Sequence, residues 1–361
     1  MNEYPRLVVD LKKLRDNIER IKSCCAARGV RLTGVVKGFT GIPACTKVFE
    51  EAGCQYIGTS RLEQIRDALA YGVKGPFMLV RLPMRSEVDE AVRLTAISLN
   101  SEIPTLRDLD AAAARQGKRH GIILMADLGD LREGFWDRRA LLEAARIVEG
   151  ELRHLDLAGV GTNLGCYGSI FPTVEKMREL VDCAEMIEAD IGRRLDILSG
   201  GGSTSLPRIF DRDMPERINQ LRVGEAIINA KDAQDLFGYD MRFMHQDVFV
   251  LQAEVIEVKD KPSYPVGEIM FDAFGLKQEY TDRGVRRRAL LALGRVDYAF
   301  PDRIYPKDAG AEVIGASSDH TIVDIADAAR DIRVGDIMEF TLCYTSTAFA
   351  SHSPNVKIAI V

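Results

Sequence analysis

A lysine stands directly after an apolar run near the start of the chain, in the sequence Leu32-Thr-Gly-Val-Val-Lys37-Gly. A short apolar run of this kind is typical of a buried strand, and lysine is rarely buried without a purpose. Partial removal from water lowers the pKa of such an amine from its ordinary value of about 10.4 and keeps it nucleophilic toward a carbonyl group. Lys37 is therefore a candidate for a Schiff base. The alternative is a lysine whose ammonium group reaches water at the rim of the fold.

A second candidate is the sequence Ser-Gly-Gly-Gly-Ser-Thr at residues 199–204, which follows another apolar run. Consecutive glycines let backbone N–H groups approach an anion closely, and hydroxyl groups add further donors. We expect Gly202, Ser203 and Thr204 to bind a phosphate group. No Gly-Lys-Ser/Thr follows, so the segment is not a Walker loop, and the glycines of residues 159–165 lack the dinucleotide-binding spacing.

Two arginines complete the set of chemically suggestive residues. Arg222 ends a further apolar run, and Arg132 lies in Asp127-Leu-Gly-Asp-Leu-Arg-Glu-Gly134. Arginine donates hydrogen bonds only and stays protonated, so a pyridine nitrogen facing Arg222 must act as an acceptor. That would make the ring a weaker electron sink, adequate for proton exchange and unfavourable for transamination. A salt-bridged arginine at the rim is the alternative for Arg222.

Arg132 is placed to contact a phenolic oxygen and to lower the pKa of an imine. A helix-capping turn is the alternative interpretation of its segment. A reactive lysine, a phosphate-binding turn, one arginine for a pyridine nitrogen and one for a phenolic oxygen together indicate pyridoxal 5′-phosphate (PLP) as the cofactor.

The elements that must position these groups alternate between apolar runs and amphipathic helical patterns. The predicted strands are residues 32–36, 56–59, 77–80, 96–99, 122–126, 157–161, 195–198 and 219–223. The clearest helical patterns are 60–71, 105–116, 138–148 and 174–190. Continuous apolar strands joined by helices predict a covered parallel sheet, and about eight such units in about 200 residues predict a (β/α)8 TIM barrel. Barrel enzymes carry their catalytic groups at the C-terminal ends of the strands, where these motifs lie.

After residue 239 the pattern changes to strands with alternating polarity. The predicted strands there are residues 247–258, 288–294, 321–325 and 337–341. We predict an α/β fold in which residues 1–240 form a PLP-binding TIM-barrel domain and residues 241–361 a β-rich C-terminal domain. The run 6–11 is a candidate strand of that second domain. The arginines 286–288, beside Arg283, are interpreted as a solvated hairpin tip.

Composition limits the class of protein further. The net charge is −6 over 361 residues, which argues against nucleic acid as a partner. No apolar run is long enough for a membrane helix, and the N-terminus lacks the features of a signal peptide. The seven cysteines include no Cys-x-x-Cys pair, and no metal-binding spacing is evident, so we expect neither a disulfide framework nor a metal site. A cytoplasmic location fits best.

With these motifs assembled, the chain resembles the alanine-racemase-like, fold-type III PLP enzymes over nearly its whole length. Val-Val-Lys37-Gly resembles their Schiff-base motif, and the pattern Asp-x-Gly-x-x-Arg-x-Gly is matched at residues 127–134. The pair Arg222-x-Gly224 resembles their pyridine-binding arginine and the adjoining backbone, at Gly224 and Glu225, that binds the phosphate. The resemblance implies a homodimer whose active sites each combine one barrel with the β-domain of the partner.

A closer resemblance is to ornithine racemases and related lysine-type racemases. It rests on Thr-Asn-Leu-Gly-Cys-Tyr-Gly at 162–168, Arg-Val-Gly-Glu-Ala-Ile at 222–227 and Gly-Ala-Ser-Ser-Asp-His at 315–320. It implies inversion of the α-carbon of a basic amino acid, ornithine first and lysine second. Carboxylates near the proposed loops are suited to pair with a substrate ammonium group; these are Glu133, Glu225, Asp297 and Asp319.

Three departures from the alanine racemases matter. Asn163 stands where those enzymes stack a histidine on the cofactor, and Gly41 stands where they place a phosphate-contacting tyrosine. Their second catalytic base is the tyrosine of Gly-Tyr-x-Asp, and the matching segment here is Gly-Arg-Val-Asp at 294–297. A two-base racemase needs a proton carrier on each face of the substrate, and Lys37 supplies only one.

Candidates for the other face lie in the β-rich domain. Asp319 and His320 follow two hydroxyl residues, Ser317 and Ser318, which we expect to bind substrate. Two runners-up for the second base are Asp297, also expected to bind substrate, and Tyr344, also expected to contact the cofactor. The alternative for residues 317–320 is a strand-opening turn closed by side-chain hydrogen bonds.

Other functions stay open at this point. The same motifs are compatible with a racemase for alanine or another small amino acid, with a non-catalytic PLP-binding carrier, and with a PLP-dependent lyase. Single-domain carriers of this type end after the barrel, and the second domain argues against that hypothesis. Arg222 disfavours the strong electron withdrawal that a lyase needs.

Overall fold

The computed structural model describes residues 3–361, and the chain divides into two compact units. The barrel unit comprises residues 14–37 and 41–244. Among the described residues, the β unit comprises 3–13, 38–40 and 245–361. The division after residue 244 lies close to the boundary that we proposed between residues 240 and 241.

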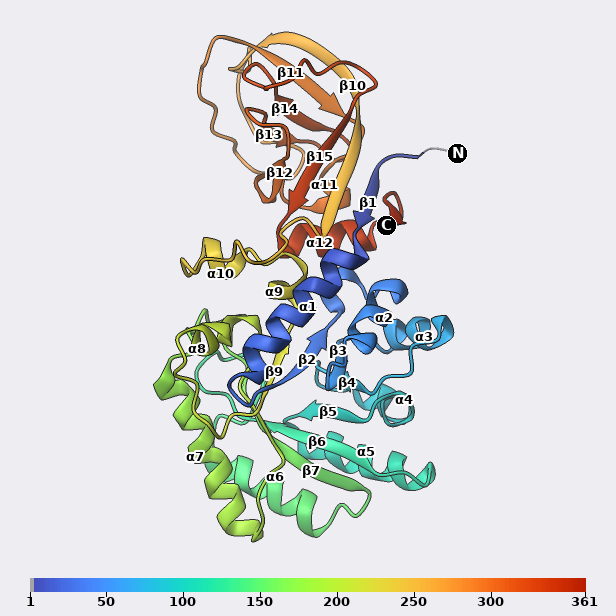
Figure 1. Cartoon of the computed structure of the whole chain (residues 1–361), viewed down its shortest axis with the longest axis vertical. Helices are drawn as coiled ribbons and strands as arrows, with labels where there is room; N and C mark the ends of the chain where they lie inside the picture. The colour runs from blue at the N-terminus through green and yellow to red at the C-terminus, as the bar shows by residue number, and fades with distance from the viewer. Residues whose placement is uncertain (1–2) are drawn as a thin grey trace. The chain divides into compact units, whose positions relative to one another are not determined.

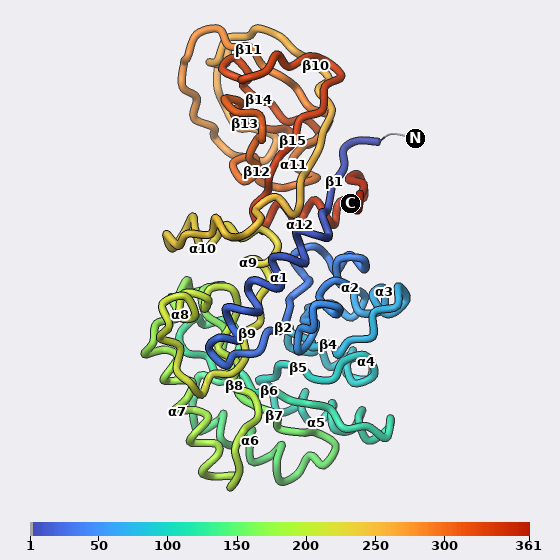
Figure 2. Tube along the Cα trace, in the orientation of Figure 1, coloured from blue at the N-terminus to red at the C-terminus, as the bar shows by residue number. Residues whose placement is uncertain are grey.

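Eight parallel strands close into a barrel in the barrel unit, and the predicted TIM barrel is confirmed. The strands are β2 (Arg31–Val35), β3 (Tyr56–Thr59), β4 (Phe77–Leu79), β5 (Ile97–Asn100), β6 (His120–Met125), β7 (Leu155–Gly161), β8 (Ile197–Ser199) and β9 (Gln220–Val223). The trace runs around the barrel from blue to yellow, and β9 returns to pair with β2 (Figure 2). Each apolar run predicted from the sequence overlaps one of these strands, with ends that differ by up to two residues.

Helices precede, separate and follow the barrel strands along the chain (Figure 1). They are α1 (Leu11–Ala26), α2 (Pro43–Glu51), α3 (Leu62–Tyr71), α4 (Val88–Leu94), α5 (Ile103–Arg115), α6 (Arg138–Gly150), α7 (Val174–Ile191), α8 (Leu206–Phe210), α9 (Glu225–Ile228) and α10 (Asp232–Asp235). Short 3₁₀ turns lie at Lys37–Phe39, Arg85–Glu87 and Ser203–Ser205. Among residues 3–361, no helix has both the length and the apolar character needed to cross a membrane.

Apolar side chains from several barrel strands pack together, and the candidate catalytic groups lie where the strands end. One buried cluster consists of Met78, Ile97, Leu99, Ile123, Met125 and Ile197. All six are nearly inaccessible to water, because strands of a covered parallel sheet are buried on both faces. The interior is therefore a packed core, and polar groups are accommodated where the strands end.

The β unit is built on a mostly antiparallel sheet, which confirms the predicted β-rich C-terminal domain. Its strands are β10 (Phe249–Pro262), β11 (Val285–Leu291), β12 (Ile304–Pro306), β13 (Glu312–Ala316), β14 (Thr321–Asp324), β15 (Ile337–Leu342) and β16 (Lys357–Ile360). The main order is β12-β15-β10-β11-β14-β13, and β1 (Arg6–Val9) pairs with β10 and β16. Two α-helices, α11 (Arg295–Tyr298) and α12 (Tyr344–His352), and a 3₁₀ turn at Pro301–Arg303 complete the unit.

The interpretation of residues 286–288 as a hairpin tip is wrong. The three arginines lie inside β11, paired with β10 on one side and, at Arg288, with β14 on the other. Arg286 donates to Asp324 at 2.8 Å, and Arg287 lies 3.3 Å from Asp331. Carboxylates supplied by distant parts of the chain thus hold a basic run in a strand. The turn is instead the long loop 263–284 between β10 and β11.

A substitution at Gly159 tests how closely the barrel strands β7 and β8 pack. A Cβ at this position would lie 1.9 Å from the carbonyl oxygen of Ile197 in the neighbouring strand β8. We expect Gly159→Ala to lower the free energy of unfolding by about 1–3 kcal/mol, because the backbone must move to admit the methyl group. Thermal and denaturant unfolding measure the change.

Gly150→Ala, at the end of α6, is the matched control. A Cβ there meets no atom within 4 Å, so we expect a change of at most about 1 kcal/mol, toward greater stability. A Gly159→Ala protein as stable as the wild type would contradict the register of β7 against β8.

Candidate active site

The charges of four side chains from three separate segments act on Lys37, which lies two residues after the end of β2. The charges of Cys166, Arg132, Glu133 and Arg222 all act on its ammonium group. These residues belong to the loops after β6 and β7 and to strand β9. The C-terminal ends of the barrel strands therefore bring together the lysine and both arginines that the sequence singled out.

Burial lowers the pKa of Lys37 below that of an ordinary lysine. Arg132 and Arg222 lower the pKa further by repulsion, whereas Cys166 and Glu133 act in the opposite direction. A lysine that only placed its ammonium group in water at the rim would not be desolvated in this way. The environment favours the neutral amine, which is the nucleophilic form.

Arg222 lies in β9 and is 6 % exposed. Its guanidinium group donates to Ser199 Oγ and, at 2.7 Å, to the carbonyl oxygen of Thr162. Both acceptors are neutral, and no ion pair with Arg222 occurs among residues 3–361, so the salt-bridge alternative does not describe this residue. Burial lowers the pKa of Arg222 to about 10, which still leaves it protonated at neutral pH. Two of its five N–H groups are used in these bonds, and the others are available for a ligand.

The predicted phosphate-binding turn faces the start of α9. Ser203 Oγ accepts hydrogen bonds from the backbone N–H groups of Gly224 and Ala226, each at 3.3 Å. Thr204 Oγ1 donates to the carbonyl oxygen of Leu164 at 2.8 Å, and Gly202 immediately precedes the 3₁₀ turn. Backbone amides and a hydroxyl group thus meet at one point, as a phosphate site requires.

Glu225 uses its side chain to support α10. Its Oε1 atom accepts from the backbone N–H groups of Lys231 at 2.9 Å and Asp232 at 3.1 Å. Its Oε2 atom is buried without a hydrogen-bond partner. Burial, followed by the charge of Asp232, raises the pKa of Glu225 to about 7. The carboxyl group therefore titrates near neutral pH next to the predicted phosphate site.

Arg132 forms a two-point ion pair with its neighbour Glu133. The hydrogen bonds to Glu133 raise the pKa of Arg132, so it is a permanent cation. Asp127 Oδ1 accepts from the backbone N–H groups of Gly129 at 2.9 Å and Leu131 at 3.1 Å, which fixes the turn before Arg132. The helix-capping alternative does not hold for this segment, since helix α6 is capped by Asp137.

Sequence reasoning missed Asp130, which fastens the loop after β7 to the loop after β6. Its buried carboxylate accepts from four consecutive backbone N–H groups, those of residues 165–168, at 2.9–3.3 Å. The same loop carries Cys166, which sequence reasoning had not assigned a role. Nothing in the sequence around an aspartate in a glycine-containing loop indicates which backbone groups it will bind.

The residues present fit PLP. Thr162 Oγ1 and Asn163 Nδ2 are buried without partners, in the segment whose carbonyl group Arg222 contacts, so the site has unsatisfied polar atoms for a ligand. The donor set consists of one amine, two guanidinium groups and backbone amides. These groups complement an aldehyde, a phenolic oxygen and pyridine nitrogen, and a phosphate, respectively.

The remaining predicted site residues belong to the β unit. Asp319 and His320 are exposed in the turn between β13 and β14, where the Ser317 N–H group donates to the carbonyl oxygen of His320 at 2.8 Å. Ser317 is exposed as well, and Ser318 is half-buried. The turn is closed by a backbone bond, and both candidate bases present their side chains to solvent in the single chain.

Asp297 and Tyr344 occupy different settings in the β unit. The Asp297 carboxylate is 4 % exposed and accepts from Ser353 Oγ at 2.8 Å, Asn355 Nδ2 at 3.1 Å and the Gly294 N–H group at 3.2 Å. It therefore already has three donors inside this unit. Tyr344 is the first residue of α12 and is half-buried.

Comparisons with known proteins agree with this geometry. The family model "Alanine racemase, N-terminal domain" matches residues 9–232. A lysine racemase of Thermotoga maritima is 39 % identical over 354 residues, 98 % of each chain. An ornithine racemase of Acetoanaerobium sticklandii is 38 % identical over 341 residues, 94 % of this chain and 95 % of the other. The crystal structure of alanine racemase from the D-cycloserine-producing Streptomyces lavendulae has a TM-score of 0.75 at 18 % identity, covering 100 % and 98 % of the two chains, which shows the same fold.

The role of Asp130 can be tested by Asp130→Asn. The amide group places N–H donors against backbone N–H groups, so at least one buried hydrogen bond is lost. We expect the free energy of unfolding to fall by about 1–3 kcal/mol and amide hydrogen exchange at residues 165–168 to accelerate. Asp137→Asn is the control, because asparagine still caps a helix. Unchanged amide hydrogen exchange at residues 165–168 would argue against the proposed role of Asp130 in holding this loop.

The raised pKa of Glu225 predicts how the free energy of unfolding changes with pH. Its pKa in the folded protein, about 7, is above its ordinary value of 4.5, so the folded state binds more protons than the unfolded state between these values. The contribution of Glu225 to stability is fully present below about pH 4.5 and is lost as pH rises through 7. Glu225→Gln stays neutral, and we expect its stability relative to wild type to rise by roughly 2–3 kcal/mol from about pH 4.5 to about pH 8. Denaturant unfolding at several pH values measures this, and a pH-independent difference would contradict it.

Proposed function

Because the chain belongs to the alanine racemase family, we propose that it is a PLP-dependent racemase that inverts the α-carbon of a basic amino acid, ornithine first and lysine second. The observation that carries this proposal is the desolvated Lys37 amine among Arg132 and Arg222 at the barrel end. Similarity over nearly the full length to a lysine racemase and an ornithine racemase supports a basic substrate.

When bound, PLP supplies an aldehyde that condenses with amines and a conjugated ring that withdraws electrons from the substrate α-carbon. Lys37 is proposed to hold the cofactor and to carry the α-proton on one face of the substrate, since burial lowers the pKa of its amine. Arg222 would donate a hydrogen bond to the ring nitrogen and, because it stays protonated at neutral pH, would leave that nitrogen unprotonated. This would limit electron withdrawal and favour return of the proton over other outcomes.

Backbone and side-chain groups around Lys37 are proposed to position the cofactor. The amides of Gly224 and Ala226, with Ser203, are proposed to hold the phosphate, and Arg132 the phenolic oxygen. Glu133 keeps Arg132 in place through their two-point ion pair. Asn163, which has a buried and unpartnered amide nitrogen, is proposed to face the cofactor ring.

The proton carrier on the opposite face is proposed to be Asp319 or His320 from the second copy in a homodimer, with Ser317 and Ser318 binding substrate beside them. Their exposure in the single chain supports this assignment. Asp297 is a weaker candidate than Asp319, because its carboxylate already accepts three hydrogen bonds. Tyr344 keeps its proposed role beside the cofactor. All seven cysteines are free thiols, which fits the proposed reducing cytoplasm.

Lys37→Ala tests the proposal directly. Wild-type protein with PLP is expected to abolish the optical rotation of L-ornithine, and the variant to lose at least about a hundredfold in rate, because it lacks both the cofactor-holding amine and one proton carrier. Wild-type protein is also expected to turn yellow with PLP and to yield a borohydride-trapped adduct at Lys37 by mass spectrometry, and the variant neither.

Lys47→Ala is the matched control, since Lys47 is a surface lysine paired with Glu50. It should keep both the adduct and the activity. No loss of rotation with ornithine, lysine, arginine and alanine would rule out the racemase proposal. Release of carbon dioxide or glycine would indicate a lyase instead, and an adduct without any turnover would indicate a carrier.

A further inference from the structure

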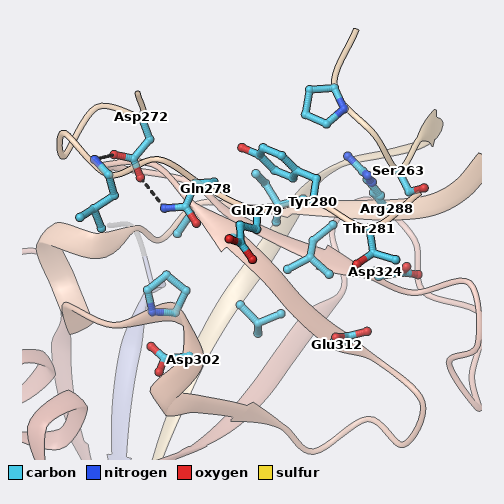
Figure 3. Close-up of a pocket in the computed structure, with 18 of the residues that line it drawn as sticks. Ser263, Asp272, Gln278, Glu279, Tyr280, Thr281, Arg288, Asp302, Glu312 and Asp324 are labelled. Atoms are coloured by element: carbon cyan, nitrogen blue, oxygen red, sulfur yellow. Dashed lines mark hydrogen bonds between the residues drawn. The ribbon is translucent and has the colours of Figure 1, made fainter. Parts of the chain in front are cut away.

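Four acids are buried in the part of the chain that the structure describes, and Glu225 differs from the other three. The others are Asp130, Asp297 and Asp324, each at most 4 % exposed. Asp130 and Asp297 accept hydrogen bonds on both carboxylate oxygens. Asp324, beside the cavity of the β unit in Figure 3, also does, from Arg286 and from a backbone N–H group. Of these four acids, only Glu225 keeps an oxygen, Oε2, without a hydrogen-bond partner.

The backbone that follows α9 folds around Glu225. The N–H groups of residues 229 and 230 donate to its backbone carbonyl oxygen, at 2.9 and 3.1 Å. Those of residues 231 and 232 donate to its Oε1 atom, at 2.9 and 3.1 Å. Four consecutive amides thus bind one residue. They hold the carboxyl group in one place, with Oε2 left over.

The charges on α10 favour the neutral form of Glu225. Burial raises the pKa of Glu225 most, and the charges of Asp232 and Asp235 raise it further, to about 7. The N–H groups of residues 231 and 232 act in the opposite direction. The ammonium group of Lys231 pairs with Asp235 at 3.3 Å. At neutral pH both forms of the carboxyl group are therefore populated.

The other segments next to α9 give the ionised carboxylate no cationic partner. Ser203 and, from α1, Asn17 bind the α9 segment through its backbone, and both side chains are neutral. Arg222 lies on β9 and Lys37 follows β2, but neither is among the charges that act most strongly on Glu225. Within residues 3–361, Glu225 makes no ion pair. A further negative charge nearby would therefore act on a carboxyl group that nothing holds in the ionised form.

The amides that are proposed to hold the cofactor phosphate flank Glu225 in the chain. The N–H groups of Gly224 and Ala226 both point to Ser203 Oγ, at 3.3 Å. Bond lengths keep the carboxyl carbon of Glu225 within roughly 5 Å of its own backbone nitrogen, which lies between those amides. Two negative groups at such a separation oppose each other, more strongly where burial excludes water. A phosphate dianion on these amides therefore disfavours ionised Glu225.

We propose that Glu225 is a proton-linked positioning residue, so that phosphate binding on the amides of Gly224 and Ala226 and protonation of Glu225 favour each other. This inference rests on the proposed function, which supplies the phosphate-bearing cofactor. The proton resides on Oε2, the oxygen that accepts no hydrogen bond. Such coupling is reciprocal: ionisation of Glu225 weakens phosphate binding by the factor by which phosphate weakens ionisation.

The sign of the pH dependence follows from the raised pKa. Below 7, Glu225 in the free protein is neutral and does not oppose the phosphate. Above 7, it is ionised, and phosphate binding must either restore its proton or overcome its charge. The affinity for PLP is therefore expected to fall as pH rises through 7, relative to a protein that lacks this carboxyl group.

Titration of full-length protein, freed of cofactor, with PLP at about pH 6 and about pH 8.5 tests the proposal. Glu225→Gln keeps an oxygen acceptor for residues 231 and 232 and cannot ionise. We expect equal dissociation constants for wild type and variant at the lower pH. At the higher pH that of wild type should be at least about fivefold larger. Glu179→Gln, which removes a carboxylate that pairs with Lys176 on α7, is the matched control and should behave like wild type.

Pyridoxal separates the effect of the phosphate from that of the aldehyde. It has the same ring and aldehyde but no phosphate, so its affinities for wild type and Glu225→Gln should change with pH in parallel. Calorimetry in two buffers of different ionisation enthalpy needs no variant. At about pH 8, binding of PLP by wild type should take up roughly 0.3–0.5 of a proton more than binding of pyridoxal.

Three results would overturn this role of Glu225: the same pH dependence of PLP binding in wild type and Glu225→Gln, an equal difference between them with pyridoxal, or equal proton uptake with PLP and pyridoxal. Near-UV circular dichroism checks that the variant is folded, and the wild-type calorimetry decides if it is not. Racemisation of L-ornithine is measured in parallel. Linked binding without racemisation contradicts only the proposed function, and racemisation without linkage contradicts only the role of Glu225. If PLP does not bind, inorganic phosphate replaces it in the calorimetry, and the same comparison of wild type with Glu225→Gln decides.

Discussion

Arg222 is a buried cation whose hydrogen-bond partners, Ser199 and Thr162, carry no charge. Burial of a cation is unfavourable, and the protein offsets it with two neutral oxygen acceptors and with the negative charge of Glu133, which acts on Arg222 without a hydrogen bond between them. The same positive charge, together with that of Arg132, opposes protonation of Lys37. Burial is the main reason that the pKa of Lys37 is lowered, and the arginine charges add to it.

Hydrogen bonds join the loops at this end of the barrel to one another. Asp130 ties the loop after β6 to the loop after β7, through the backbone of residues 165–168. Ser203 ties the loop after β8 to the start of α9, which follows β9. Thr204 adds a bond back to Leu164. Since a cofactor site requires groups held to within a fraction of an ångström, these cross-loop bonds are what fix its geometry.

The sequence predicted the barrel and the groups at its strand ends because both depend on local patterns. An apolar run places its last residue at the rim, so Lys37 and Arg222 could be located from the strands that carry them. Asp130 could not, since its role depends on four backbone groups 35–38 residues away. The prediction for arginines 286–288 was wrong for a similar reason. Their local charge indicates a turn, but Asp324, on a distant strand, accepts a hydrogen bond from Arg286 and stabilises it in β11. Contacts between distant segments decide such positions.

Arg295, in the segment Gly-Arg-Val-Asp at 294–297, is held by the loop before β11. The guanidinium group lies 3.6 Å from Asp272 and 3.9 Å from the centre of the Phe274 ring, both in the loop 263–284. An arginine held in this way is a donor only and cannot accept a proton at neutral pH. Arg295 thus anchors the loop 263–284 to the start of α11. The proposed second proton carrier is therefore a residue other than Arg295.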